Sequence, residues 1–370
     1  MKFYLIAGER SGDLHGGNLI LSLKRHLSEA SFRGFGGDYM QSAGMEVSVH
    51  YRELAFMGFL EVLANLFTIK KRLKQCRDEI LEFRPDVVVL IDYAGFNLRI
   101  AKFAKQQGIK VFWYIAPKVW AWNQNRALKL KANVDRMFTI LPFEKDFFQK
   151  FDWKVDYVGN PVLDSVKSHQ PNPEFLSKNN FNKHSKLIAL LPGSRKQELQ
   201  RIIPLMTNVV SRLPDFQFGL AVVDNLSQSL YAPLQAYSNV HFVCGSTYDL
   251  LSNAHAAIVT SGTATLETAL FKVPQVVVYK TSAISFAIGK LLIKVPFISL
   301  VNLIANKEVV KELIQDEASE EKTFAELSSM LMNEGYRSEI LKGYDQIIKV
   351  LDTGSASENT ARLMVSYLKS

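Results

Sequence analysis

Cysteine, uninterrupted apolar segments and nucleic-acid-binding motifs are all scarce in this sequence. Only two cysteines occur in 370 residues, Cys76 and Cys244, and neither has a CxxC partner. This usage excludes a disulfide framework and fits a reducing compartment. No run of about 20 apolar residues is free of charge, because two lysines and a proline interrupt the best candidate, 286–305. The N-terminus also lacks the long apolar region of a signal peptide. We therefore expect a cytoplasmic protein that does not span a membrane.

Basic residues are present in excess. Lysine and arginine total 44 against 36 aspartates and glutamates, a net charge of +8, which favours an anionic partner such as nucleic acid, anionic lipid or a phosphorylated substrate. Residues 56–67 are apolar around most of a predicted helix and run into a basic stretch, 70–74. That pattern is typical of a helix lying on anionic lipid, with a buried core helix as the alternative. No nucleic-acid-binding motif accompanies it, so we expect an anionic membrane surface and no nucleic acid as partner.

Short apolar segments alternate with amphipathic helical patterns through most of the chain. The predicted strands are 3–7, 46–51, 86–91, 110–115 and 135–141 in the first half, and 187–191, 216–223, 240–244, 256–260 and 275–279 in the second. Alternation of strand and helix implies parallel pairing with right-handed crossovers. The sequence therefore predicts a doubly wound α/β fold.

A polar, Pro/Asn-rich stretch at 168–185 separates two such halves. A chain of this length can form two domains that each bury a core. We expect a Rossmann-like domain over 1–165 and a second over 166–344. The end of the chain is predicted to be all-helical, near 319–334, 336–352 and 355–369. Helices of 345–370 are expected to pack back on the first domain, although periodicity leaves open a swap to a partner subunit and hence a homodimer.

The first candidate binding loop follows the first predicted strand. Ligands of parallel sheets bind beyond the carboxyl ends of the strands. Here a glycine-rich turn contains Glu9, Ser11, Gly12 and Asp13 and opens a helix, so its backbone N–H groups suit a phosphate. The spacing is neither a dinucleotide fingerprint nor a P-loop. An ordinary helix N-cap by Ser11 or Asp13 is the alternative.

A second candidate loop ends the strand at 187–191. The turn contains Gly193 and Ser194 and ends in Arg195. A planar guanidinium at this place can make charge-assisted hydrogen bonds to a diphosphate. A plain surface arginine is the alternative.

A third candidate loop follows the strand at 256–260. Its small residues are Ser261, Gly262, Thr263 and Ala264, and a helix begins there. Glu267 lies about one turn further on, where a carboxylate can accept both hydroxyls of a ribose, although it could also only complement the helix dipole. The second and third loops together predict a nucleotide-diphosphate pocket without obligatory metal ligands, so no metal and no cofactor are expected.

Two further loops offer groups for an acceptor. Asp92 ends a strongly apolar strand, and Asn97 follows in the next helix. We expect Asp92 to point into a cleft between the domains and to act as a general base if its pKa is raised, with a local turn hydrogen bond as the alternative. Trp120 and its neighbours, followed by Arg126, suit stacking against a sugar or an acyl chain as well as core packing.

The ordered series of motifs resembles one family. It comprises AGERSGD, MGFLEVL, IDYAGFN, YIAPKVWAW, ILPFEKDFF, VGNP, ALLPGSR, SGTATLE and LVNLIANKEVVKELIQDE, running from residue 7 to about 317. Together these motifs resemble the lipid-A-disaccharide synthases, bacterial glycosyltransferases of lipid A and lipopolysaccharide biosynthesis. The match departs from the family pattern at Ala94, where a proline is usual.

The resemblance implies two facing Rossmann-like domains of the GT-B type, with the acceptor on the first and the UDP-sugar on the second. The implied reaction is inverting transfer of 2,3-diacylglucosamine from UDP to 2,3-diacylglucosamine 1-phosphate (lipid X), giving lipid A disaccharide 1-phosphate and UDP. The implied location is peripheral, on the inner face of the inner membrane. Alternatives are a UDP-sugar 2-epimerase, another UDP-sugar transferase of the same fold, or a non-enzymatic nucleotide- or lipid-binding regulator.

The resemblance also carries residue roles. Asp92 matches the base, with Glu9 and Asp13 beside it as catalytic residues. Ser11, Gly12 and the loops around Arg195 and Glu267 match the UDP and phosphate site. The expected pocket and acceptor residues are Met57, Asn97, Trp120, Arg126, Asn302 and Glu308.

Overall fold

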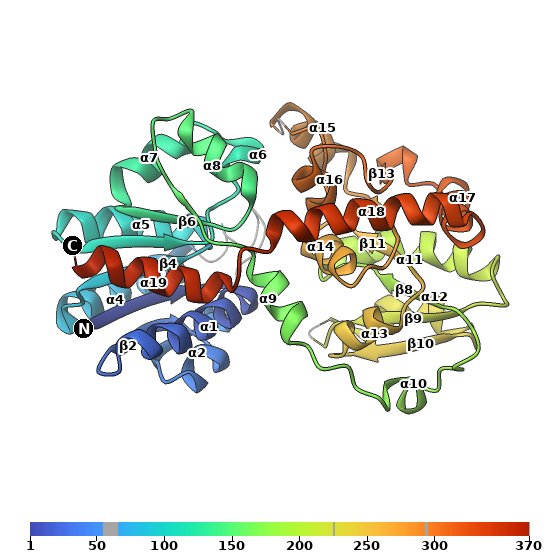
Figure 1. Cartoon of the computed structure of the whole chain (residues 1–370), viewed down its shortest axis with the longest axis horizontal. Coiled ribbons are helices and arrows are strands. Elements are labelled where there is room, and N and C mark those ends of the chain that lie inside the picture. Colours follow the sequence, from blue (N-terminus) through green and yellow to red (C-terminus); the bar gives the residue numbers. More distant parts are fainter. Residues whose placement is uncertain (55–65, 225, 293–294, 370) are drawn as a thin grey trace. The chain divides into compact units, whose positions relative to one another are not determined.

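A computed structural model describes residues 1–54, 66–224, 226–292 and 295–369. The chain forms two compact units. One contains Met1–Pro161 together with Asp352–Ser370, and the other contains Val162–Leu351 (Figure 1). Each unit has its own sheet and core, so each is described separately.

The first unit is built on a parallel sheet of seven strands in the order β3-β2-β1-β4-β5-β6-β7. The strands are β1 Lys2–Ala7, β2 Ser31–Gly36, β3 Glu46–His50, β4 Val87–Ile91, β5 Lys110–Tyr114, β6 Arg136–Thr139 and β7 Asp156–Tyr157. The helices are α1 Arg10–His26, α2 Asp38–Ser42, α4 Leu66–Phe83, α5 Ala94–Gln106, α6 Val119–Trp122, α7 Arg126–Asn133, α8 Pro142–Gln149 and α19 Ala356–Lys369. The five strands predicted here are all present, within two residues at each end, whereas β2 and β7 were not predicted.

Helices cover both faces of this sheet. Alternate strand residues such as Leu5 and Val89 pack with Leu23 of α1, and Met364 of α19 belongs to the same core cluster. Strand residues of the opposite parity, such as Tyr4, are buried as well. Burial on both faces is typical of doubly wound parallel sheets.

The second unit has a parallel sheet of six strands in the order β10-β9-β8-β11-β12-β13. The strands are β8 Leu187–Leu191, β9 Gln217–Val222, β10 Val240–Cys244, β11 Ala256–Thr260, β12 Gln275–Tyr279 and β13 Glu312–Ile314. The helices are α9 Pro161–Ser168, α10 Phe175–Lys178, α11 Lys196–Ser211, α12 Ala232–Gln235, α13 Thr247–Asn253, α14 Thr263–Leu270, α15 Ala283–Leu292, α16 Leu300–Ala305, α17 Glu320–Met332 and α18 Glu334–Leu351. All five strands predicted for this half are present; the three-residue β13 was not predicted.

Both sheets reverse their strand order at one place. In the first unit this point lies between β1 and β4, and in the second between β8 and β11. In doubly wound sheets, ligands bind in the crevice beyond the carboxyl ends of the two strands that flank such a switch point. The four loops leaving β1, β4, β8 and β11 therefore define the candidate sites.

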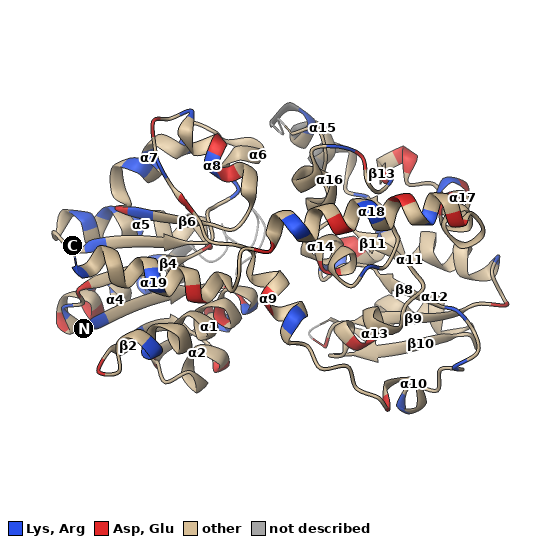
Figure 2. Ribbon diagram, viewed as in Figure 1, with Lys and Arg blue, Asp and Glu red and all other residues tan. Residues whose placement is uncertain are grey.

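Charge is distributed over both units. Lysine and arginine residues are interspersed with aspartate and glutamate in the view of Figure 2. None of the helices in the described ranges is both long enough and apolar enough to cross a bilayer. Most of the predicted interfacial segment, 56–65, lies outside the described residues. Phe67, at the start of α4, is 84% exposed, and Lys70, Lys71 and Lys74 after it are exposed too.

Candidate functional site

The loops leaving β1 and β4 touch each other at the switch point of the first unit. Ala7 pairs with Ile91 in the parallel register, so Gly8 and Asp92 continue from neighbouring strand ends. The ring of Tyr93 lies directly against Gly8, where an added Cβ would be 2.3 Å from the Tyr93 Cγ. A side chain at residue 8 would therefore displace the loop that carries Asp92.

Asp92 is held in an unusual backbone conformation. Its φ is 45°, and that of Tyr93 is 46°, in the left-handed region that few non-glycine residues occupy. The Asp92 N–H donates to the Tyr114 carbonyl at 3.2 Å. The buried Asn97 amide donates to the carbonyl oxygens of Asp92 at 2.9 Å and Ile91 at 3.3 Å. These hydrogen bonds stabilise a strained backbone conformation of the kind found at functional sites.

The carboxyl group of Asp92 is electrostatically suited to accept a proton. Burial raises its pKa above the usual value, while the positive charge of Lys118 and the Tyr93 backbone N–H lower it. Burial is the largest of these effects, so the carboxylate is a stronger base than an ordinary aspartate. The geometry thus supplies a base with a neighbouring cation.

The β1–α1 loop contributes a second carboxylate that is already engaged. Asp13 is 1% exposed, and its oxygens accept from the N–H groups of Gly37 at 2.7 Å, Tyr39 at 3.1 Å and Met40 at 3.1 Å. These bonds fix the start of α2 and use both carboxylate oxygens. A catalytic role for Asp13 stays a prediction.

The other predicted residues of this loop lie at the start of α1. Glu9 occupies the N-cap position, where it makes no side-chain cap hydrogen bond. Ser11 is exposed and Gly12 is buried, with an added Cβ at Gly12 only 3.3 Å from the Ala7 Cβ. Neither Ser11 nor Asp13 is the N-cap residue, so the simple capping alternative does not hold.

The predicted acceptor residues of the first unit divide into a buried and an exposed group. Trp120 is 5% exposed and donates its indole N–H to Glu144 Oε1 at 3.0 Å. Arg126 lies over the ring of Trp122, 4.5 Å from its centroid, and Trp122 is 43% exposed. The Arg126–Trp122 pair is therefore the accessible stacking surface. Met57 lies outside the described residues.

The loop leaving β8 is hydrogen-bonded to a carboxylate side chain of the helix that follows it. Glu198 of α11 accepts from the N–H groups of Ser194 at 3.1 Å and Arg195 at 3.2 Å, and from the Arg195 guanidinium at 2.7 Å. Gly193, with a φ of +101°, leaves room for this carboxylate, because an added Cβ would lie 2.4 Å from Glu198 Oε2. The turn is thus able to bind an oxyanion, and the Arg195 side chain is 61% exposed.

The loop leaving β11, the neighbour of β8 in the sheet, is open at its tip. Gly262 and Thr263 are exposed and Ala264 is half-buried, and no atom of the described residues lies within 4 Å of an added Cβ at Gly262. Ser261 donates its hydroxyl to the Ile298 carbonyl at 2.9 Å, which anchors the turn. Among the residues that the structure describes, no side chain therefore covers the start of α14 at Gly262.

Glu267 of α14 is positioned by a tyrosine. The Tyr248 hydroxyl donates to Glu267 Oε1 at 3.0 Å. Burial raises the pKa of Glu267, and the Tyr248 hydrogen bond lowers it. One carboxylate oxygen is thereby oriented by the protein.

Asn302 and Glu308 lie on the segment that enters β13. The buried Asn302 amide donates to Val310 O and Glu312 Oε1, both at 2.9 Å, and accepts from the N–H groups of Val309 and Val310. Its polar atoms tie α16 to β13. Glu308 precedes β13, so it lies toward the opposite end of the parallel sheet from the loops leaving β8 and β11. Contact of either residue with UDP stays a prediction.

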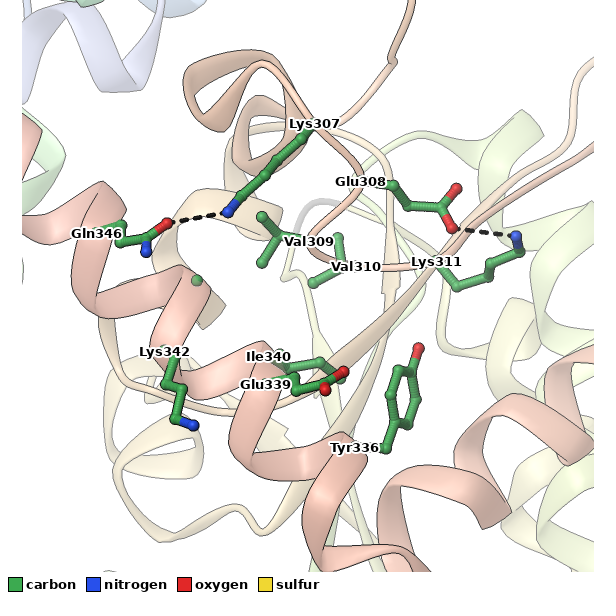
Figure 3. A pocket seen from close by; sticks show the side chains of 11 residues that line it. Lys307, Glu308, Val309, Val310, Lys311, Tyr336, Glu339, Ile340, Lys342 and Gln346 are labelled. Carbon is green, nitrogen blue, oxygen red and sulfur yellow. Dashed lines mark hydrogen bonds and ion pairs between the residues drawn. The ribbon is translucent and has the colours of Figure 1, made fainter.

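Glu308 lines a cavity of about 290 Å³ between the segment before β13 and α18. Figure 3 shows Glu308 paired with Lys311 and Lys307 bonded to Gln346 around this cavity. The lining mixes basic, acidic and apolar side chains, without a convergent set of one charge. Within the described ranges, no group of three His, Cys, Asp or Glu residues is arranged to hold a metal ion.

Several residues beside the predicted sites were missed by the sequence reasoning. These are Tyr93, Lys118, Glu144, Glu198 and Tyr248. A signal existed for Glu198 and Glu144, because each stands at the third helical position, as in a capping box. Tyr248 had none, since it comes from α13, 19 residues before Glu267.

Comparison with known proteins shows a family match over almost the whole chain. Residues 3–364 match a family model described as lipid-A-disaccharide synthetase. A curated relative, the lipid-A-disaccharide synthase of Geobacter sulfurreducens, is 36% identical over 373 residues, covering 99% of this chain and 97% of the relative.

Solved structures share the fold at low identity. A glycosyltransferase of kitacinnamycin aligns with a TM-score of 0.71 at 13% identity over 99% of both chains. The UDP-GlcNAc 2-epimerase of Neisseria meningitidis, bound to UDP-GlcNAc, aligns with a TM-score of 0.66 at 16% identity over 100% of both chains. The predicted α/β fold of two Rossmann-like domains is confirmed by these similarities and by the two parallel sheets.

Proposed function

The chain belongs to the lipid-A-disaccharide synthetase family, and we propose that it joins UDP-2,3-diacylglucosamine to 2,3-diacylglucosamine 1-phosphate. The products are the lipid A disaccharide 1-phosphate and UDP. The observation that carries this proposal is the family match, which spans residues 3–364 and so includes all four switch-point loops.

Asp92 acts as the general base. The acceptor hydroxyl oxygen attacks the anomeric carbon of the donor, the bond from that carbon to the UDP oxygen breaks, and the hydroxyl proton passes to the Asp92 carboxylate. The half-buried position of Asp92, its raised pKa and its place at the β1/β4 switch point support this role. Because the hydroxyl attacks in a single step from the face opposite the departing UDP, the anomeric centre inverts.

UDP binds to the second unit. Arg195 and the N–H groups of Ser194 and Arg195 bind the diphosphate, which replaces the Glu198 carboxylate as their anionic partner. The turn at Gly262 gives the nucleotide access to the start of α14, and the Glu267 oxygen not bonded by Tyr248 accepts from the ribose. The flanking position of both loops at the β8/β11 switch point supports the assignment.

The acceptor binds to the first unit. Trp122 and Arg126 offer the exposed surface, and Glu9 and Ser11 lie at the neighbouring helix start. Asn97 contributes through the backbone of Asp92 that it holds.

The protein works at an anionic membrane surface, on the inner face of the inner membrane. The exposed Phe67, followed by Lys70, Lys71 and Lys74, supports an apolar contact flanked by attraction to anionic lipid. Sedimentation with vesicles tests this: anionic vesicles should bind the wild type, while Phe67→Ser with Lys70→Glu should bind much less. Equal binding to anionic and purely zwitterionic vesicles would contradict it.

The epimerase alternative has less support. The UDP-GlcNAc 2-epimerase of Neisseria meningitidis shares the fold at 16% identity, whereas the family model and the full-length relative are both of the synthase kind.

The decisive assay measures UDP release from UDP-2,3-diacylglucosamine, with and without 2,3-diacylglucosamine 1-phosphate, in detergent and excess chelator. Release that requires the acceptor and persists with chelator is expected. Asp92→Asn should lose turnover by about 10²–10⁴-fold and keep its affinity for UDP. Binding of UDP without release from either lipid combination would refute the assigned substrates.

A further inference from the structure

The loop that follows β5 is fastened at both ends. The Ile115 N–H donates to the Phe138 carbonyl of β6 at 3.0 Å. At the other end, the Trp120 indole N–H donates to Glu144 Oε1 at 3.0 Å. The loop residues between these anchors therefore have little freedom to move relative to the sheet.

Glu144 connects this loop to the next one along the sheet. Its second oxygen accepts from the N–H groups of Ile140 at 3.1 Å and Leu141 at 2.9 Å. The side chain is 1% exposed, and burial raises its pKa to about 7. A buried carboxylate with three N–H donors is costly to disturb, because each donor would lose its partner.

The fastened loop carries a lysine that acts on Asp92. Lys118 is exposed at its tip, and its positive charge lowers the pKa of Asp92 and of Glu144. Asp92 itself is bonded to the strand from which the loop departs, through its N–H and the Tyr114 carbonyl at 3.2 Å. The distance from Lys118 to Asp92 therefore depends on how the loop is held.

The other groups around Asp92 do not replace this charge. Tyr93 donates its hydroxyl to the Leu54 carbonyl, and its pKa is raised to about 12 by burial and by Glu9, so it is neutral. Glu9, from the β1–α1 loop, adds negative charge. Among the described residues, Lys118 is thus the cation whose charge lowers the pKa of Asp92.

We propose that Glu144 and Trp120 are positioning residues for the transfer reaction, because their hydrogen bond fixes the loop that carries Lys118. This loop leaves β5, the strand paired with the one that ends just before Asp92. The inference rests on the proposed role of Asp92 as base. A purely structural reading is that Trp120 only packs, edge to face with Phe143 at 4.9 Å. The two readings differ in their effect on the ionisation of Asp92.

The test is the pH profile of kcat/KM for the full-length chain. Its acid limb reports the pKa of the base in the free enzyme. Lys118→Met removes the cation, so the acid limb should move upward by about one pH unit, the size of a typical neighbouring-charge effect. Glu144→Gln and Trp120→Phe should each move it in the same direction by a smaller amount.

Matched variants separate charge from folding. Lys118→Arg should restore the wild-type profile, and Lys129→Met, at an exposed lysine on α7, should leave it unchanged. If Glu144→Gln and Trp120→Phe lower the melting temperature without moving the acid limb, the positioning role is refuted. An unchanged limb in Lys118→Met refutes it as well.

The role of Asp92 is tested alongside. If Asp92→Asn keeps turnover, the proposed base is wrong and the positioning proposal falls with it. If Asp92→Asn is inactive and Lys118→Met keeps the wild-type limb, only the positioning proposal fails.

Discussion

Asp13 and Asp92 offer a sharp separation between a structural and a catalytic carboxylate. Asp13 accepts from three backbone N–H groups of the α2 start, two of them in buried bonds. Replacing Asp13 by alanine leaves these donors without a partner. Asp92, by contrast, is a half-buried group whose pKa is raised by desolvation, so the fold disfavours its charge.

The expected magnitudes follow from these contacts. A buried donor left unsatisfied costs about 1–3 kcal/mol, so Asp13→Ala should lower the free energy of unfolding by about 3–5 kcal/mol. Asp13→Asn keeps one oxygen, which can still accept from Gly37 and Met40, and should cost about 1–3 kcal/mol for the lost Tyr39 bond. Asp92→Asn removes a disfavoured charge and should leave stability unchanged or slightly raised.

The assay uses a property of this chain. All four tryptophans, Trp113, Trp120, Trp122 and Trp153, belong to the first unit. Tryptophan fluorescence during urea denaturation therefore follows the unfolding of that unit alone. Turnover of each variant is measured as UDP release in urea-free buffer at a pH near neutrality.

We expect a graded loss of stability at Asp13 and an isolated loss of turnover at Asp92. An Asp13→Asn variant with the wild-type unfolding midpoint and the turnover of Asp92→Asn would refute it. That result would make Asp13 a catalytic group despite its three backbone partners.

Three further predictions follow from other contacts. Tyr248→Phe removes the hydrogen bond to Glu267. The KM for the UDP-sugar should therefore rise about tenfold, the size expected for a hydrogen bond to a charged group, while kcat stays nearly unchanged. Steady-state kinetics that show a lower kcat and an unchanged KM would contradict this. Gly193→Ala places a Cβ against Glu198 Oε2 at a φ of +101°, so calorimetry should find weaker UDP binding, and wild-type affinity would exclude a role for the turn. Burial raises the pKa of Glu144 from 4.5 to about 7, so the protonated form of Glu144 favours folding. Its contribution to the free energy of unfolding is fully present below pH 4.5 and is lost, by up to about 3 kcal/mol, as the pH rises through 7. Urea unfolding followed by tryptophan fluorescence should show this fall, and a Glu144→Gln variant with the same pH slope would contradict it.

The strands were predictable where burial on both faces left an apolar run between polar turns. β8 and β11 are such runs and have the predicted ends. β2, with the sequence SFRGFG, was missed because two glycines and an arginine obscure the pattern. Gly34 is there because an added Cβ would lie 2.0 Å from the Leu5 carbonyl oxygen, a close approach that no local rule reveals.

The candidate site was predictable to the level of loops. Each loop follows a buried strand, and parallel strands bring their carboxyl ends to one edge. The partners that tune these loops come from other elements, as the bonds from Tyr248 to Glu267 and from Trp120 to Glu144 illustrate. Such pairs depend on tertiary packing, which periodicity does not encode.

The return of the chain to its first unit has a consequence for how the protein is made. Ala361, Met364 and Val365 of α19 complete the core that Leu19 and Leu23 of α1 begin. The second unit is continuous in sequence, whereas the first needs the final residues of the chain. During synthesis on the ribosome, the first unit therefore begins to emerge before the second but is completed after it, and its unfinished apolar face is exposed to chaperones until α19 has emerged.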